Sequence, residues 1–229
     1  MMEDLAEELI SKLDSKISFV VPIFGGIPIP NSVVVTWGIM AFVMILTLIF
    51  VRNLKIVPTG PQVFVEAIVG FITGIFNGIL GEEGKRYVPY MSTVLIYLAL
   101  ANLVGLVGLT PPTKDLNVTA GLALMSIIII EYSGIHKKGG KKYIKSFAEP
   151  MAILAPINIM EIFIRPLSLC MRLFGNILGG FVVMELIKIV APAVIPIPFS
   201  FYFDIFDGII QAYVFVFLTS LFMKEKMEG

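Results

Sequence analysis

The sequence predicts an all-α membrane protein with about five transmembrane helices and one further helix at the membrane surface. Hydrophobic residues make up 57% of the 229 residues and charged residues only 15%, whereas soluble domains carry about a quarter charged residues. The apolar residues also gather in five stretches close to the roughly 20 residues that a spanning helix needs. Composition and spacing therefore agree on the class.

The first predicted span follows a polar N-terminal segment. Residues 1–16 are acidic, where a secretory signal would begin with basic residues and continue at once into an apolar run. We therefore expect a retained tail over residues 1–32, then a span over Val33–Val51. With no repeat or low-complexity tract after it, the chain over residues 33–229 is predicted to be a single helical membrane domain.

The next apolar stretch, Pro61–Leu80, is predicted to be an interfacial or re-entrant helix. Four polar residues interrupt it without forming one stripe at about 100° per residue: Gln62, Glu66, Thr73 and Asn77. A sixth span is the alternative. It would divide the basic loops between the two faces of the membrane, so we favour the surface position.

The remaining spans are Val88–Leu109, Leu116–Ile135, Pro150–Val190 and Phe199–Met223. Counting the surface helix, the fifth helix has about forty residues and is about 60 Å long, roughly twice the hydrocarbon thickness. It must therefore lie strongly tilted or bend, and Pro156 and Pro166 provide positions for bending. The sixth helix is expected to pack against it.

Lysine and arginine indicate the orientation, because they concentrate in cytoplasmic loops. With five spans, every basic loop falls on one side, which places the N-terminus outside and the C-terminus in the cytoplasm. The basic run His136–Lys145 is interpreted as this topology signal rather than as a patch for anionic lipid or nucleic acid.

A polar stripe follows one face of the long helix. On a helical wheel its members lie within about 40° of Arg172: Glu161, Arg165, Ser168, Asn176 and Gly179. Gly175 and Gly179 also form a small-xxx-small pair that lets another helix approach. A charge at mid-membrane costs about 3 kcal/mol even on lenient scales, so Arg172 needs a partner. That partner is either an acid of this chain, as a structural pair, or a moving carboxylate from another subunit.

The last helix carries a second polar face, because Asp204, Asp207 and Gln211 are spaced by three and four residues. Glu185 lies near the outer end of the long helix, so three carboxylates are predicted to gather on the outer side. They could line an aqueous access path or simply reach water at helix ends. Gln211 lies deeper, and it and Asn176 could instead serve helix-to-helix hydrogen bonding.

Several function classes are excluded. Seventeen basic residues balance seventeen acidic ones without a basic and aromatic cluster, so nucleic-acid binding is not expected. Cys170 and His136 cannot form a disulfide or a zinc site, and no Gly-rich loop ends in Gly-Lys-Ser/Thr as a phosphate cradle requires. We expect no metal, no cofactor and no enzymatic activity in this chain.

Two rival functions stay open. A self-contained channel or secondary transporter could use Arg172 for a substrate anion, but no inverted repeat is evident. An intramembrane hydrolase would need a Ser-His, paired-Asp or zinc constellation. Asp204 and Asp207 are too close on one helix to act on a peptide from both sides.

Three stretches resemble subunit a of the F-type ATP synthase. "PLSLCMRLFGNILGG" (Pro166–Gly180) resembles its signature, "PPTKDLNVTAGLAL" (Pro111–Leu124) is similar to its segment entering a span, and "GIIQAYVFVFLTSLFM" (Gly208–Met223) is similar to its C-terminal helix. The resemblance covers roughly Pro58–Met223 in the same order. Together the three motifs are highly specific.

The resemblance implies roles for individual residues. Arg172 falls on the essential stator arginine, Asn176 on a nearby asparagine, and Gln211 on the glutamine of the last helix. Phe181 stands where some members carry an outer half-channel acid, with Glu185 one turn later. The other implied outer-channel residues are Asp204, where some members have histidine, and Asp207; those supporting the ring-facing side are Glu161, Arg165, Ser168, Gly175 and Gly179.

The implied function is that of the ion-translocating stator. Two half-channels would lead to carboxylates on a ring of c subunits, with the arginine separating them, and ATP chemistry would belong to partner subunits. The implied partners are the c ring, the b-subunit peripheral stalk, the rest of the complex and the lipid of a bacterial plasma membrane. Proton and sodium both stay possible, and the inner half-channel has only candidates: Glu66, Asn102 and Glu131.

Overall fold

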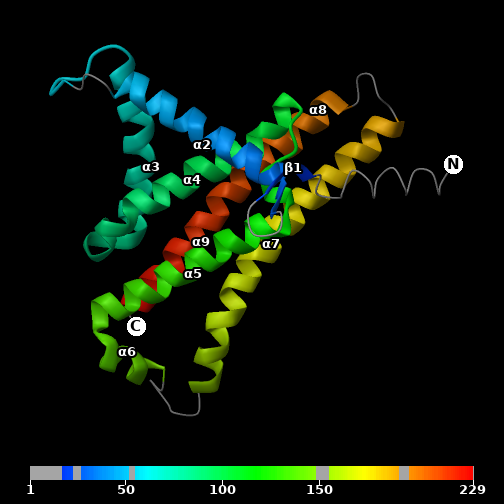
Figure 1. Cartoon of the computed structure of the whole chain (residues 1–229). Coiled ribbons are helices and arrows are strands. Elements are labelled where there is room, and N and C mark those ends of the chain that lie inside the picture. Colours follow the sequence, from blue (N-terminus) through cyan, green and yellow to red (C-terminus); the bar gives the residue numbers. More distant parts are fainter. Residues whose placement is uncertain (1–16, 23–26, 52–54, 148–154, 191–195, 229) are drawn as a thin grey trace. The chain divides into compact units, whose positions relative to one another are not determined.

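The computed structural model describes residues 17–22, 27–51, 55–147, 155–190 and 196–228 (Figure 1). Most of these residues are helical. The strands and α-helices are β1 (Ile17–Val21), β2 (Ile27–Pro30), α2 (Asn31–Phe50), α3 (Pro61–Gly84), α4 (Val88–Leu103), α5 (Leu116–Lys138), α6 (Gly140–Ser146), α7 (Ala155–Val190), α8 (Pro196–Ser200) and α9 (Gly208–Glu228). Short 3-10 helices lie at Lys85–Tyr87, Val104–Val107 and Pro112–Lys114, and Phe201–Asp207 is a π-helix.

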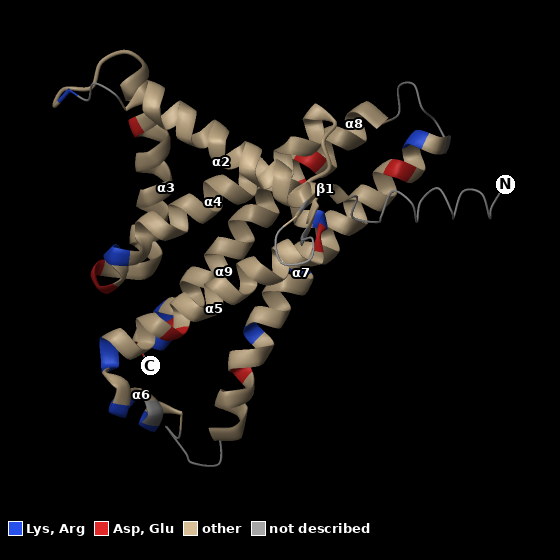
Figure 2. Cartoon of the chain, in the orientation of Figure 1, with Lys and Arg blue, Asp and Glu red and all other residues tan. Residues whose placement is uncertain are grey.

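The predicted fold class is confirmed. Five helical stretches are long and apolar enough to cross a membrane: Asn31–Phe50, Pro61–Val107, Leu116–Lys138, Ala155–Ile189 and Pro196–Glu228. Figure 2 shows charged residues clustered around α6 and the turn after α3, whereas α2 and α4 carry none. The chain is therefore an all-α membrane protein.

One short sheet lies within the predicted N-terminal tail. Strands β1 and β2 pair antiparallel, with Phe19 opposite Ile29 and Val20 opposite Pro28. No strand was predicted here, because Pro28 and Pro30 cannot donate to a ladder and argue against a strand interior. Because the sheet has only two strands, β2 is an edge strand. Its prolines, which have no N–H to donate, can therefore face away from β1. The acidic residues 1–16 lie outside the described residues.

A helix is present where the sequence predicted an interfacial or re-entrant one, and it is longer than expected. It extends as α3 to Gly84, and Gly81 within it has a positive φ of 65°, a conformation that glycine adopts without steric cost. The chain turns sharply between α3 and α4 there (Figure 1). The joint stretch Pro61–Val107 has 47 residues, about 70 Å as one helix, too long for a single straight crossing. The interfacial position of α3 stays a prediction.

Contacts divide the chain into two compact units. The first unit comprises the described parts of Met1–Phe42, Tyr97–Thr119 and Arg172–Ala212. The second comprises those of Val43–Ile96, Ala120–Met171 and Tyr213–Gly229. Helices α2, α4, α5, α7 and α9 each contribute residues to both units, so one helix can carry different polar groups in each.

In the first unit, hydrogen bonds tie helix ends together around Asn102. The buried Asn102 side chain donates from Nδ2 to the backbone oxygen of Gly208 (2.8 Å), and its Oδ1 accepts from the Thr113 hydroxyl (2.8 Å). Asn31 Nδ2 donates to Thr110 Oγ1 at 3.0 Å. These bonds satisfy buried polar groups that would otherwise cost free energy. They fix the turn before α5 against the start of α9.

In the second unit, large apolar side chains form the core. The fully buried ones are Phe76, Met91, Ile130, Leu169, Phe215 and Met223. They come from α3, α4, α5, α7 and α9. Lys137 at the end of α5 pairs with Glu83 at the end of α3, 2.5 Å from Nζ to Oε1, so the charged ends of these helices also meet.

Asp115 is the N-cap of α5, and its replacement by alanine should destabilise the fold. Its backbone is extended (φ −83°, ψ 121°), and its Oδ1 accepts from the Asn117 N–H at 3.0 Å, as a capping carboxylate does. Its Oδ2 also accepts from Ser32 Oγ at 2.7 Å. We expect Asp115→Ala to lower the free energy of unfolding by about 1–2 kcal/mol.

Thermal denaturation of the detergent-solubilised chain measures this effect. Asp115→Asn is the matched control, because asparagine caps helices as well as aspartate does and keeps an oxygen to accept a hydrogen bond. If alanine and asparagine lower the midpoint equally, the cap does not stabilise the helix as described.

Candidate functional site

A cavity of about 800 Å³, lined by both polar and apolar residues, lies within the first unit. Its walls come from α7, from the turn that follows α4, and from the α8 and π-helical segment before α9. Four of the residues predicted to act in ion translocation line it: Asn176, Glu185, Asp204 and Asp207. The structure thus brings together side chains from α7 and from the last helical stretch, as the sequence pattern predicted.

The three predicted carboxylates that line the cavity differ in their partners. Glu185 is only 7% exposed and accepts from Lys188 Nζ at 2.9 Å. Asp204 accepts from the Ser200 hydroxyl at 2.6 Å. Asp207 lines the cavity from the end of the π-helix. Carboxylates in a confined polar space lower the energy of a cation there, since opposite charges attract more strongly where water is limited.

The two aspartates lie on the π-helical segment, which was not predicted. The sequence pattern indicated one regular helix from Phe199, whereas the chain forms α8, then the π-helix Phe201–Asp207, then α9. π-Helical turns are wider than α-helical turns and are frequent at functional sites. The spacing of Asp204 and Asp207 by three residues matches a regular amphipathic helix, so nothing in it indicates a π-helical segment.

Asn176 and Gln211 form an amide pair in the first unit. Asn176 Nδ2 donates to Gln211 Oε1 at 2.7 Å, which joins α7 to α9. Gln211 is 3% exposed, and its Nε2 has no hydrogen-bond partner among the described residues. The helix-to-helix role that the sequence left open for these two residues is therefore seen, together with a buried donor that is free to bind another group.

Arg172 lies one turn before Asn176 on α7. Its side chain is exposed, and in the described part of the chain its guanidinium makes no hydrogen bond or ion pair. A Cβ added at Gly175 or Gly179 would meet nothing within 4 Å among those residues. This face of α7 is thus open, and the structural pairing of Arg172 with an acid of this chain finds no support there.

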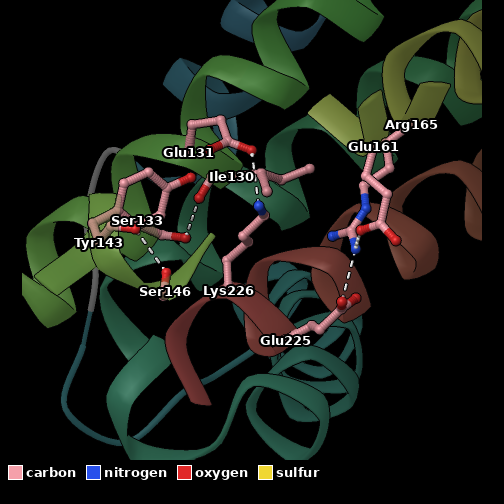
Figure 3. Close-up of polar contacts among 9 residues, drawn as sticks. All are labelled: Ile130, Glu131, Ser133, Tyr143, Ser146, Glu161, Arg165, Glu225 and Lys226. Carbon is pink, nitrogen blue, oxygen red and sulfur yellow. Dashed lines mark hydrogen bonds and ion pairs between the residues drawn. The ribbon is translucent and has the colours of Figure 1, made fainter. Parts of the chain in front are cut away.

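The N-terminal part of the predicted polar stripe on α7 belongs to the second unit and has partners on α9. Figure 3 shows Arg165 reaching Glu161 on its own helix and Glu225 on α9, and the Nη2 of Arg165 lies 2.7 Å from Glu225 Oε1. The guanidinium also lies over the Phe222 ring, 4.8 Å from its centroid. Arg165 is therefore a buried contact between helices, while Ser168 stays exposed.

The cavity contains further polar residues that the sequence reasoning did not select. They are Asn31, Ser32, Asn102, Lys114, Asp115 and Lys188. Lys114 lies over the Phe181 ring, 4.0 Å from its centroid. Lys114 and Asp115 lie in the segment between the predicted spans Val88–Leu109 and Leu116–Ile135. The adjacent opposite charges of these two residues could have indicated a polar site. Their partners, Phe181 and Ser32, come from distant parts of the chain.

The inner half-channel candidates fall in different units. Asn102 lines the same cavity as Asp204 in the first unit. Glu66 and Glu131 lie in the second, where Glu66 accepts from Gln62 Nε2 at 2.6 Å and Glu131 lies 3.6 Å from Lys226 Nζ (Figure 3). In the described ranges, no group of three or more His, Cys, Asp or Glu is placed to hold a metal ion.

The fold and this site define a helical membrane protein with polar and charged groups between its helices. The chain matches the ATP synthase A chain family over residues 33–224, and it belongs to that family. It is thus a subunit of the ion-translocating membrane sector of an ATP synthase complex.

Three relatives illustrate the similarity. The chain is 36% identical to ATP synthase subunit a of Moorella thermoacetica over 206 residues, which covers 90% of this chain and 94% of the relative. It is 33% identical to "ATP synthase subunit a, sodium ion specific" of Propionigenium modestum, covering 87% and 74%. It is 35% identical to ATP synthase subunit a 2 of a Bradyrhizobium species, covering 87% and 89%.

Proposed function

We propose that this chain is the non-catalytic stator that carries ions to and from a ring of c subunits through two half-channels. The observation that carries the proposal is the cavity of the first unit, in which Glu185, Asp204, Asp207 and Asn176 meet. Arg172 lies one helical turn from Asn176 on the open face of α7. A polar path and an unpaired cation on the same helix are the two parts that such a stator needs.

In this mechanism the cavity is the outer half-channel. A cation enters from outside, passes Glu185, Asp204 and Asp207, and reaches a carboxylate on the c ring near mid-membrane. It then travels with the ring and leaves through an inner half-channel. The cation is a proton or a sodium ion; the name of one relative specifies sodium.

Arg172 separates the two half-channels. A nearby cation favours the charged form of a carboxylate, so a ring carboxylate that passes Arg172 releases its ion and crosses unloaded. This prevents a direct leak. Arginine suits the task because its guanidinium stays charged in a membrane interior, where lysine gives up its proton more readily. The open surface at Gly175 and Gly179 leaves room for helices of the ring.

The remaining partners and the orientation follow from the same proposal. The chain lies in a bacterial plasma membrane with its N-terminus outside and its C-terminus in the cytoplasm. A b-subunit peripheral stalk holds it against rotation. Helix α3 lies at the inner membrane surface. The residues of the second unit, including Arg165 and Glu161, support the shape of the ring-facing helix.

The outer-channel role is tested by removing charge from the cavity. We expect the double change Asp204→Asn and Asp207→Asn to lower passive ion flux through the assembled membrane sector by about tenfold or more. The loss of two nearby negative charges raises the energy of a cation in the path by at least about 1.4 kcal/mol. Flux is measured in vesicles after removal of the catalytic sector, for protons and for sodium.

The matched control changes two exposed acids of the second unit, Glu82→Gln and Glu228→Gln, and should leave the flux unchanged. Assembly of each variant is checked by its content of c subunits. If the cavity variant conducts like the control at equal assembly, the cavity is not the outer path.

A further inference from the structure

Three glycines lie where the π-helical segment and the start of α9 approach their neighbours in the first unit. A Cβ at Gly105 would lie 2.8 Å from Asp204 Oδ1, one at Gly180 would lie 3.2 Å from Phe203 Cδ1, and one at Gly208 would lie 3.0 Å from Asn102 Cβ. At each of these positions an added side chain would force its neighbour to shift. Gly105 differs from the other two because its neighbour is a carboxylate of the cavity.

Asp204 is the nearest neighbour of the space beside Gly105. The three nearest heavy atoms to the added Cβ are Oδ1, Cγ and Oδ2 of Asp204, at 2.8, 3.2 and 3.7 Å. Gly105 belongs to the 3-10 helix Val104–Val107 and is not among the glycines with positive φ. An alanine would therefore fit the backbone, and its Cβ would meet the carboxylate first.

The other oxygen of Asp204 is held from its own chain segment. Ser200 Oγ donates to Asp204 Oδ2 at 2.6 Å. Both Gly105 and Ser200 line the cavity. The Asp204 carboxylate thus lies between Gly105, which has no side chain, and the Ser200 hydroxyl, which donates to it. These two neighbours fix where its negative charge lies in the cavity.

We propose that Gly105 and Ser200 are positioning residues that set the place of the Asp204 carboxylate in the ion path. This inference rests on the proposed function of the cavity. Gly105 provides the space for Oδ1, and Ser200 orients Oδ2. An ion passing the cavity then meets the carboxylate at a defined point instead of a side chain that samples several rotamers.

The test measures passive ion flux through the assembled membrane sector in vesicles. We expect Gly105→Ala to lower the flux by about two- to tenfold, the range that corresponds to forcing one side chain off its preferred rotamer. Gly180→Ala is the matched control, because its Cβ crowds the Phe203 ring of the same segment without touching a carboxylate. Gly180 lines the same cavity, and its replacement should lower the flux less than Gly105→Ala does.

A double-mutant cycle separates positioning from packing. In an Asp204→Ala background, Gly105→Ala should cause no further loss, since the group that it displaces is gone. Ser200→Ala should lower the flux in the natural chain but not in that background, and Ser200→Thr, which keeps the hydroxyl, should restore it.

Each outcome bears on one of the two claims. If Asp204→Ala leaves the flux unchanged, the proposed role of the cavity fails and the positioning role fails with it. If Asp204→Ala lowers the flux and Gly105→Ala has no effect, the positioning inference alone is overturned. The same holds if Gly105→Ala causes an equal loss with and without Asp204, or if Gly180→Ala causes as large a loss.

Discussion

Replacing Arg172 by alanine is expected to abolish ATP-driven ion uptake by the complex in membrane vesicles. Without the guanidinium, a passing ring carboxylate is no longer held in its charged form, so a loaded site can cross between the half-channels and ions leak back. The loss should be complete within the sensitivity of the assay. ATP hydrolysis by the partner subunits should persist, uncoupled from uptake.

Assembly should survive this change. Arg172 is exposed, and the part of the chain that the structure describes offers it no hydrogen bond or ion pair, so its removal breaks no contact there. Arg86→Ala is the matched control, since Arg86 is an exposed arginine on the second unit. It should leave coupled uptake at the natural level.

Arg172→Lys tests whether a positive charge alone is enough at this position. Lysine keeps a positive charge but is a compact ammonium that shifts its pKa readily when buried, so we expect only partial recovery of uptake. Intact pumping in a fully assembled Arg172→Ala complex would show that the residue is structural, and the proposed mechanism would then be wrong.

The sequence predicted the helical stretches and the faces of α7 and α9 well, for a physical reason. A residue period of 3.6 is a local property of the chain, so the wheel could place Asn176 on the face of Arg172 and leave Gln211 within reach. The hydrogen bond between Asn176 and Gln211 follows from two such faces meeting. Arg172 itself stands out because a charge in an apolar run is costly.

Other features depend on contacts between distant segments and left no local signal. Arg165 was placed on the polar stripe, but its contact with Glu225, sixty residues away, needs the packing of α9. The π-helical turn around Asp204 is accompanied by close approach at Gly105. Neither could be read from spacing, because periodicity describes a helix and not its neighbour.

The second large effect is expected from Arg165→Ala, which should destabilise the second unit. The Arg165 side chain is 9% exposed, and its Nη2 contacts both Glu161 and Glu225, while the ring of Phe222 lies beneath the guanidinium. Alanine removes two charge-assisted contacts and the aromatic contact at once. We expect the free energy of unfolding to fall by about 2–4 kcal/mol.

Glu225→Gln is the matched control for this change. The Glu225 side chain is 60% exposed, and an ion pair open to solvent on one side contributes about 0–1 kcal/mol; Arg165 would still keep Glu161. Thermal denaturation of the detergent-solubilised chain should therefore show a much larger fall in midpoint for Arg165→Ala than for Glu225→Gln. Equal midpoints would mean that the buried guanidinium does not hold α7 against α9, and that apolar packing around Leu169 and Phe215 maintains this contact by itself.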